Sequence, residues 1–195
     1  MSGKHHINTS IAGTALLLEG ITISSRHKPH GSSSILLNYF HHSSLFIWIC
    51  GLLCLIIGAL LPDIDLRDSM ISKLVHFHIP IRHRTWTHTL WLLLIPIIIG
   101  WVLLLRSSNC NASFLWFSLA LGIFWHLVMD SLSVGGVCWL YPITQYINYP
   151  DGAHIKKHHW LKLYSVKKKS KAERFIVFVI DVLASIGLIL TLAES

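Results

Sequence analysis

The stretch HRTWTH, from His83 to His88, decides how we expect this chain to fold. It places two imidazoles and a guanidinium at the start of an apolar run, Thr89–Leu105, that is long enough to enter a bilayer. Ionisable groups beside hydrocarbon are costly unless they are paired or coordinated, so this stretch needs partners from elsewhere in the chain. Candidate partners lie at the ends of two other apolar runs, in LLPDID (Leu60–Asp65) and HLVMD (His126–Asp130).

The composition is that of a membrane protein. The 195 residues are 53% hydrophobic and only 13% charged, and the mean hydropathy is +0.58. These values argue against an ordinary soluble domain and against a disordered chain. Because no repeat and no long linker divides the sequence, we expect one integral membrane domain over residues 1–195.

Five apolar stretches predict an all-α fold, a polytopic membrane bundle of about five helices. The stretches are Ile7–Ile23, Leu45–Leu61, Thr89–Leu105, Phe114–Met129 and Phe175–Leu192. The first is short and carries Glu19, so it either crosses the membrane or lies half-buried in it.

The basic residues predict an orientation, because lysine and arginine prefer cytoplasmic loops. Most of the 16 lysines and arginines fall on one side of the predicted topology, in the segments Asp63–His88 and Ser131–Arg174 and at Lys4. We therefore expect a multi-pass protein whose N-terminus is cytoplasmic. The lysine-rich segment Lys156–Arg174 fits anionic membrane lipid as its partner, with no nucleic acid expected, although steering of an anionic substrate is an alternative role.

This topology brings the histidines and carboxylates of the run ends to one cytoplasmic interface. They are His6, Asp63, Asp65, His83, His88, His126 and Asp130. His126 and Asp130 are four residues apart and share a helix face, a spacing used by paired metal ligands, although a simple ion pair at the helix end is equally consistent with it. We also expect Thr87 to cap the helix that follows. The sequence thus predicts a metal-binding cup.

The same residues carry a family resemblance. The motifs are H-x3-S-I-A at His6, LLPDID at Leu60, HR-x2-TH at His83, and G-x3-H-x3-D with GG and W-x-YP over Gly122–Pro142. In these motifs the chain resembles the YdjM-like family, described as inner-membrane-bound metal-dependent hydrolases of bacteria. That family is more distantly similar to zinc-dependent phospholipase C and the single-strand nucleases of the same helical fold.

The resemblance implies a ligand set and a location. Carried over by motif, the metal ligands are His6, Asp63, His83, His88, His126 and Asp130, and the location is the bacterial inner membrane. Imidazole and carboxylate ligands suit zinc, with manganese not excluded. The later H-x3-E pair of the soluble enzymes is missing, so we expect one or two ions rather than three. The family description also implies an association with an SOS-type repressor.

The expected function is metal-dependent hydrolysis of an anionic ester through a metal-activated water, with a lipid phosphoester or another membrane-bound ester as the substrate. Arg84 is our candidate for a phosphate contact, because its planar fork matches two oxygens, with cytoplasmic anchoring as an equal alternative. Asp65 is the second candidate catalytic residue, since it either ligates, orients a histidine or bridges two ions. Two other functions stay open: a divalent-cation transporter, and a non-catalytic membrane regulator or scaffold with a structural metal.

Overall fold

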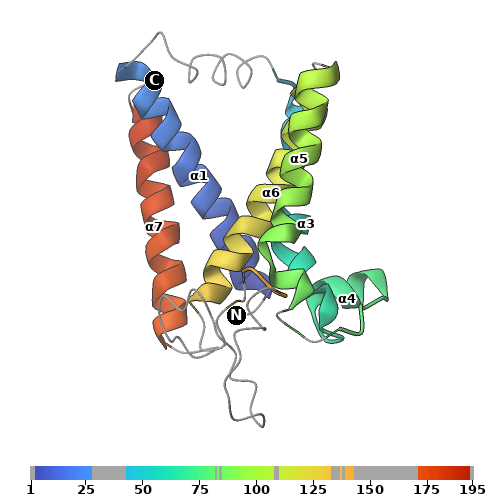
Figure 1. The fold of residues 1–195 in the computed structure, drawn as a ribbon. Helices are drawn as coiled ribbons and strands as arrows, with labels where there is room; N and C mark the ends of the chain where they lie inside the picture. The colour runs from blue at the N-terminus through green and yellow to red at the C-terminus, as the bar shows by residue number, and fades with distance from the viewer. Residues whose placement is uncertain are drawn as a thin grey trace.

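The computed structural model of the chain is helical (Figure 1). It describes residues 3–27, 43–81, 83, 85–107, 110–132, 137, 139–142 and 171–193, and these residues include no β-strand. Arg84 and most of the lysine-rich segment, residues 156–170, lie outside the described residues. Our expectations for them stay predictions.

Five long helices form the bundle. They are α1 (Gly3–His27), α3 (Leu45–Leu60), α5 (Leu90–Ser107), α6 (Cys110–Ser131) and α7 (Lys171–Ala193). Three short elements lie between α3 and α5 in the chain: η1 (Leu61–Asp65), α4 (Met70–Val75) and η2 (Trp86–His88). Each predicted apolar stretch therefore lies in a helix, as expected for the all-α class.

Two of the described helices are long and apolar enough to cross a membrane. These segments are Leu45–Asp65 and Cys110–Ser131, whereas Leu90–Arg106 and Phe175–Ile186 are shorter apolar helices. Large apolar side chains are exposed along the helices, among them Phe46, Trp101 and Leu105. Exposure of so many apolar groups is typical of a surface that meets lipid. The number of crossings remains our prediction of about five.

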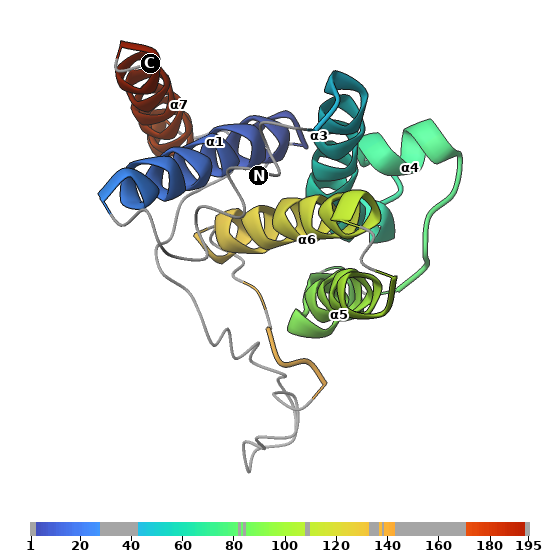
Figure 2. The ribbon, with the colours of Figure 1, turned by 90° about the horizontal axis from the view of Figure 1, so that it is seen from above.

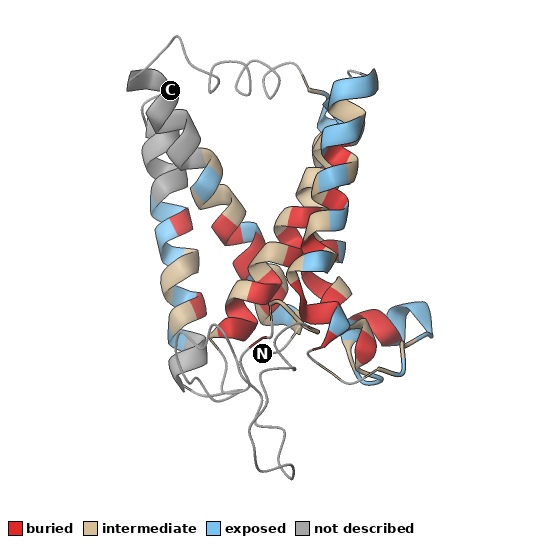
Figure 3. Ribbon diagram, in the orientation of Figure 1, coloured by how far each residue is buried: buried red, intermediate tan, exposed pale blue. Residues whose placement is uncertain are grey.

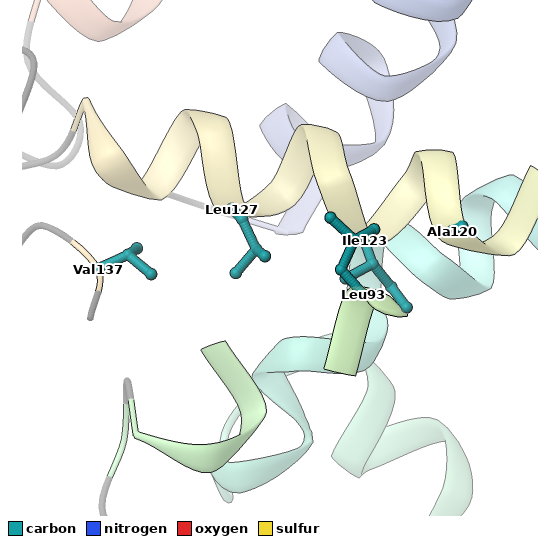
Figure 4. Packing of buried hydrophobic residues seen from close by; sticks show 5 residues of the cluster. All are labelled: Leu93, Ala120, Ile123, Leu127 and Val137. Atoms are coloured by element: carbon teal, nitrogen blue, oxygen red, sulfur yellow. The ribbon is translucent and has the colours of Figure 1, made fainter. Parts of the chain in front are cut away.

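Helix α6 lies at the centre of the arrangement. It packs against α3, α5 and α1, and α7 packs against α1 on the outer side (Figure 2). Buried residues gather at the end of the bundle that holds η1 and η2, whereas α5 is more exposed toward its other end (Figure 3). The apolar core between α5 and α6 contains Leu93, Ala120, Ile123, Leu127 and Val137 (Figure 4).

Helices α3 and α6 approach each other at backbone distance. A Cβ atom added to Gly58 would lie 2.2 Å from the carbonyl oxygen of Leu119, and one added to Gly122 would lie 2.2 Å from that of Leu55. Small residues permit such close crossings of membrane helices. The contact fixes the end of α3 beside α6. From there η1 begins at Leu61, and Pro62 within it has no N–H to extend the α-helix.

Candidate metal centre

The predicted histidines and carboxylates meet at one end of the bundle, near the start of α1 (Figure 1). His6 comes from α1, Asp63 and Asp65 from η1, His83 from the segment before η2, His88 from η2, and His126 and Asp130 from the end of α6. All are buried except His83, which is half-buried. The predicted convergence is therefore observed, and it joins residues more than 120 positions apart in the sequence, such as His6 and Asp130.

The donor atoms form three linked groups, each compact enough to hold a metal ion. The groups are His6 with His126 and Asp130, Asp63 with His88 and His126, and Asp65 with His83 and His88. Because His126 and His88 are each shared by two groups, the three groups make one continuous cluster.

A backbone carbonyl sets the tautomer of His126. The Nδ1 atom of His126 lies 2.7 Å from the carbonyl oxygen of Ala59. A carbonyl can only accept, so Nδ1 donates its hydrogen and Nε2 of the neutral ring carries a lone pair. This is the usual arrangement of a metal-binding histidine, whose second nitrogen donates to an oxygen that orients the ring. Nε2 points toward Asp63 and Asp130, at 3.7 Å and 4.0 Å from their nearest oxygens.

The hydroxyl of Thr87 sets the tautomer of His88 in the same way. Thr87 Oγ1 donates to Asp65 Oδ2 at 2.7 Å, and it lies 3.0 Å from His88 Nδ1. Because the hydroxyl hydrogen is used, the oxygen accepts the Nδ1–H of His88. Burial lowers the pKa of His88 from its usual value, and the nearby carboxylate of Asp63 opposes this effect. The neutral ring therefore turns an Nε2 lone pair toward the cluster.

Two lone pairs then face each other in a buried place. The Nε2 atoms of His88 and His126 are 3.3 Å apart, and His88 Nε2 is also 3.7 Å from Asp63 Oδ1 and 3.6 Å from Asp130 Oδ2. Such a gathering of lone pairs and negative charge is unfavourable unless a proton or a cation lies among them. Ligand atoms about 2.0–2.2 Å from zinc stand roughly 3.3–3.6 Å apart in a tetrahedral site. The donor set therefore fits a divalent metal.

The group around Asp65 differs, because its members are already hydrogen-bonded to one another. Asp65 Oδ1 lies 2.9 Å from His83 Nδ1, and Asp65 Oδ2 accepts from Thr87. A carboxylate held in this way orients imidazoles, one directly and the other through the hydroxyl. The structure thus places Asp65 where it orients histidines, one of the three roles left open by the sequence.

His6 closes the cluster on the side of α1. Its ring stacks on that of His126 with the centroids 3.9 Å apart, and its Nε2 atom lies 3.5 Å from Asp130 Oδ1. Its Nδ1 atom is buried and has no hydrogen-bond partner. His6 therefore offers a nitrogen to the same carboxylate that faces His88 and His126.

The expected role of Thr87 was wrong. Thr87 lies inside η2, and α5 begins only at Leu90, so Thr87 does not cap α5; its hydroxyl instead joins Asp65 to His88. The backbone N–H of Leu90 donates to the carbonyl of Trp139, and the indole of Trp91 donates to that of Tyr141. The W-x-YP motif therefore holds the start of α5 beside the cluster, a role that spacing alone did not indicate.

Helices apolar enough for a membrane, with a buried histidine and aspartate cluster at one end, define a class: an integral membrane protein with a site suited to a metal ion. The sequence model of the YdjM inner membrane protein family matches residues 1–193. The chain belongs to this family, which makes it an inner membrane protein. No curated protein and no solved structure matches the chain.

Proposed function

We propose that this protein is a metal-dependent hydrolase that cleaves a phosphoester, with a membrane lipid as the substrate class. The observation that carries the proposal is the pair of Nε2 atoms of His88 and His126, 3.3 Å apart and close to two carboxylates. A divalent ion bound there would supply an activated water and take up charge on a phosphoryl oxygen. Zinc is the ion that imidazole and carboxylate donors suit best, and manganese is the alternative.

In this proposal the residues of the cluster have three different roles: metal binding, proton transfer and positioning. In this proposal the ion is held by residues whose ligand atoms lie within 4.8 Å of one another in two linked groups: His6, His126 and Asp130, and Asp63, His88 and His126. His83 is 30% exposed and donates Nδ1–H to Asp65, so its Nε2 atom is available to accept a proton from the attacking water and return it to the leaving alcohol. Asp65 is the positioning residue for His83 and, through Thr87, for His88.

The position of the cluster supports hydrolysis over transport. Asp63 follows α3, His88 precedes α5, and Asp130 is the penultimate residue of α6. A cation transporter would hold its ligands near the bilayer midplane with access from both sides. Ligands at helix ends instead suit a site that meets headgroup phosphates and water at one interface, which we place on the cytoplasmic side.

The test is metal analysis combined with a phosphoesterase assay on detergent-purified protein. We expect one or two zinc ions per chain in the wild type, with loss of metal and of hydrolysis in His126→Ala and Asp130→Ala. His78→Ala is the matched control, since His78 belongs to none of the three donor groups. Circular dichroism and gel filtration would establish that each variant folds.

Two results would contradict the proposal. Unchanged metal content in both folded variants would remove these residues from the site. Metal that binds through them without hydrolysis of any phospholipid or of a soluble phosphodiester would leave a structural or regulatory metal, as in a membrane scaffold.

A further inference from the structure

One face of α1 carries buried polar groups that have no hydrogen-bond partner among the residues that the structure describes. Thr9 and Ser10 are fully buried, and neither hydroxyl has a hydrogen-bond partner. Three further buried atoms also have no hydrogen-bond partner, although Thr14 and Trp125 are only partly buried as residues: Nδ1 of His6, Oγ1 of Thr14 and the indole nitrogen of Trp125. Buried polar groups are nearly always hydrogen-bonded, so a cluster of exceptions points to a ligand.

Other hydroxyls of the bundle show what is unusual about these. Ser118 and Ser131 on α6 and Ser185 on α7 each donate at 2.8 Å to the carbonyl four residues earlier. A serine or threonine within a helix can satisfy its hydroxyl in this way. Thr9, Ser10 and Thr14 do not, although they lie in a helix with the same carbonyls available.

The unpartnered groups form a column that starts at the metal centre. His6, Thr9, Ser10 and Gly13 are spaced at i, i+3, i+4 and i+7 and therefore share one face of α1, with Thr14 beside them. From His6 to Thr14 the column extends about 12 Å along the helix axis. We name these residues together with Trp125 the α1 column.

Because Gly13 has no side chain, the ring of Trp125 packs directly against α1. A Cβ atom added to Gly13 would lie 2.5 Å from Cε2 of Trp125, the carbon bonded to the indole nitrogen. The ring therefore lies directly against α1, one turn beyond Ser10. Trp125 also precedes His126 on α6, so the column and the metal cluster share two adjacent residues of that helix.

We infer that the α1 column binds the uncharged ester oxygens of a membrane lipid whose phosphate lies at the metal centre; this rests on the proposed function and names its substrate more closely. Hydroxyls and an indole N–H carry no charge, and the indole only donates. They suit neutral acceptors such as ester carbonyls, whereas a phosphate calls for cations. The column starts at the cluster, and the helix that carries it also exposes large apolar side chains such as Ile11 and Leu17, as a lipid requires.

The experiment compares an ester lipid with its ether analogue. Wild-type protein in detergent is titrated with dioleoyl phosphatidylglycerol and with the dialkyl ether form, which lacks both carbonyls, and bound lipid is counted by native mass spectrometry. We expect the wild type to bind the ester lipid roughly tenfold more tightly, an effect of one or two hydrogen bonds. The variant Thr9→Val/Ser10→Ala keeps the side-chain volumes and should bind both lipids alike.

Controls separate this inference from the proposed function. Ser118→Ala removes a hydroxyl that is satisfied by Phe114, so it should keep the preference for the ester lipid. Metal content should be unchanged in all these variants, and Ser10→Ala alone serves if the double variant does not fold. Equal binding of the two lipids by the wild type would overturn the inference, because it is the result expected if the column holds only water. A preference for the ester lipid that survives in the Thr9→Val/Ser10→Ala variant would also overturn it. A preference that depends on Thr9 and Ser10 in a protein without hydrolytic activity would leave the lipid site standing and remove the hydrolase.

Discussion

Gly58 and Gly122 are in direct contact where α3 crosses α6. A Cβ atom added to Gly58 would lie 3.2 Å from the Cα of Gly122, and one added to Gly122 would lie 3.0 Å from the carbonyl carbon of Gly58. The crossing joins the helix that leads to Asp63 with the helix that carries His126. The packing of two glycines therefore sets the distance between ligands on different helices.

We predict that Gly122→Ala weakens both the fold and metal binding. The added methyl group meets backbone atoms that cannot move without separating the helices, and overpacking of this kind costs about 1–3 kcal/mol. Thermal unfolding in detergent and a chelator competition measure the two effects. Gly100→Ala is the control, because its methyl group would meet the side chain of Phe117, which can shift. Equal metal affinity in Gly122→Ala and the wild type would show that the crossing does not position the ligands.

Thr87→Val should reduce metal affinity by about 10- to 100-fold, the usual effect of losing a group that orients a ligand. Valine keeps the shape of threonine but removes the oxygen that donates to Asp65 and accepts from His88. Calorimetric titration of the metal-free protein with zinc measures the loss. Thr87→Ser retains the hydroxyl and should bind close to wild type; a Thr87→Ser variant as weak as Thr87→Val would mean that packing, rather than the hydrogen bonds, matters here.

Hydropathy and charge were enough to predict the helices and the convergence of the ligand residues. Four of the apolar runs begin or end at histidines or carboxylates, which are costly in hydrocarbon unless paired, and this is why we expected these groups to meet. The spacing of His126 and Asp130 likewise follows from helix periodicity.

The finer parts of the site depend on contacts that sequence patterns do not encode. Nothing in the order of residues indicates that the carbonyl of Ala59 accepts a hydrogen bond from Nδ1 of His126, since the two residues are 67 positions apart. The role of Thr87 was misassigned because a threonine before an apolar run is also typical of a helix cap. The unpartnered hydroxyls of α1 are visible only once the neighbours of each side chain are known.

The stability of the metal-free protein should fall as the pH decreases through the usual pKa of histidine, about 6.5. Burial lowers the pKa of His88 in the folded protein, so below this pH the unfolded chain takes up a proton that folded His88 does not. The contribution of His88 is therefore fully present above pH 6.5 and declines toward its lowered pKa. Melting temperatures measured in EDTA between pH 8 and pH 5 give the slope, and His88→Gln should make it shallower. Parallel slopes for the two proteins would assign the pH dependence to other histidines.

The metal centre should face the cytoplasm, because the segment that follows η1 carries Arg67 and Lys73 and basic residues are retained inside. Two single-cysteine proteins test this in intact cells with a maleimide that does not cross membranes. In one, Asp68→Cys marks the cluster end, where the side chain of Asp68 is 96% exposed; in the other, native Cys110 marks the opposite end, where α6 begins. We expect Cys110 to be labelled in intact cells and the cysteine at position 68 only after permeabilisation. The reverse pattern would place the cluster on the outer face, and labelling of both positions in intact cells would mean that the helices between them do not cross the membrane.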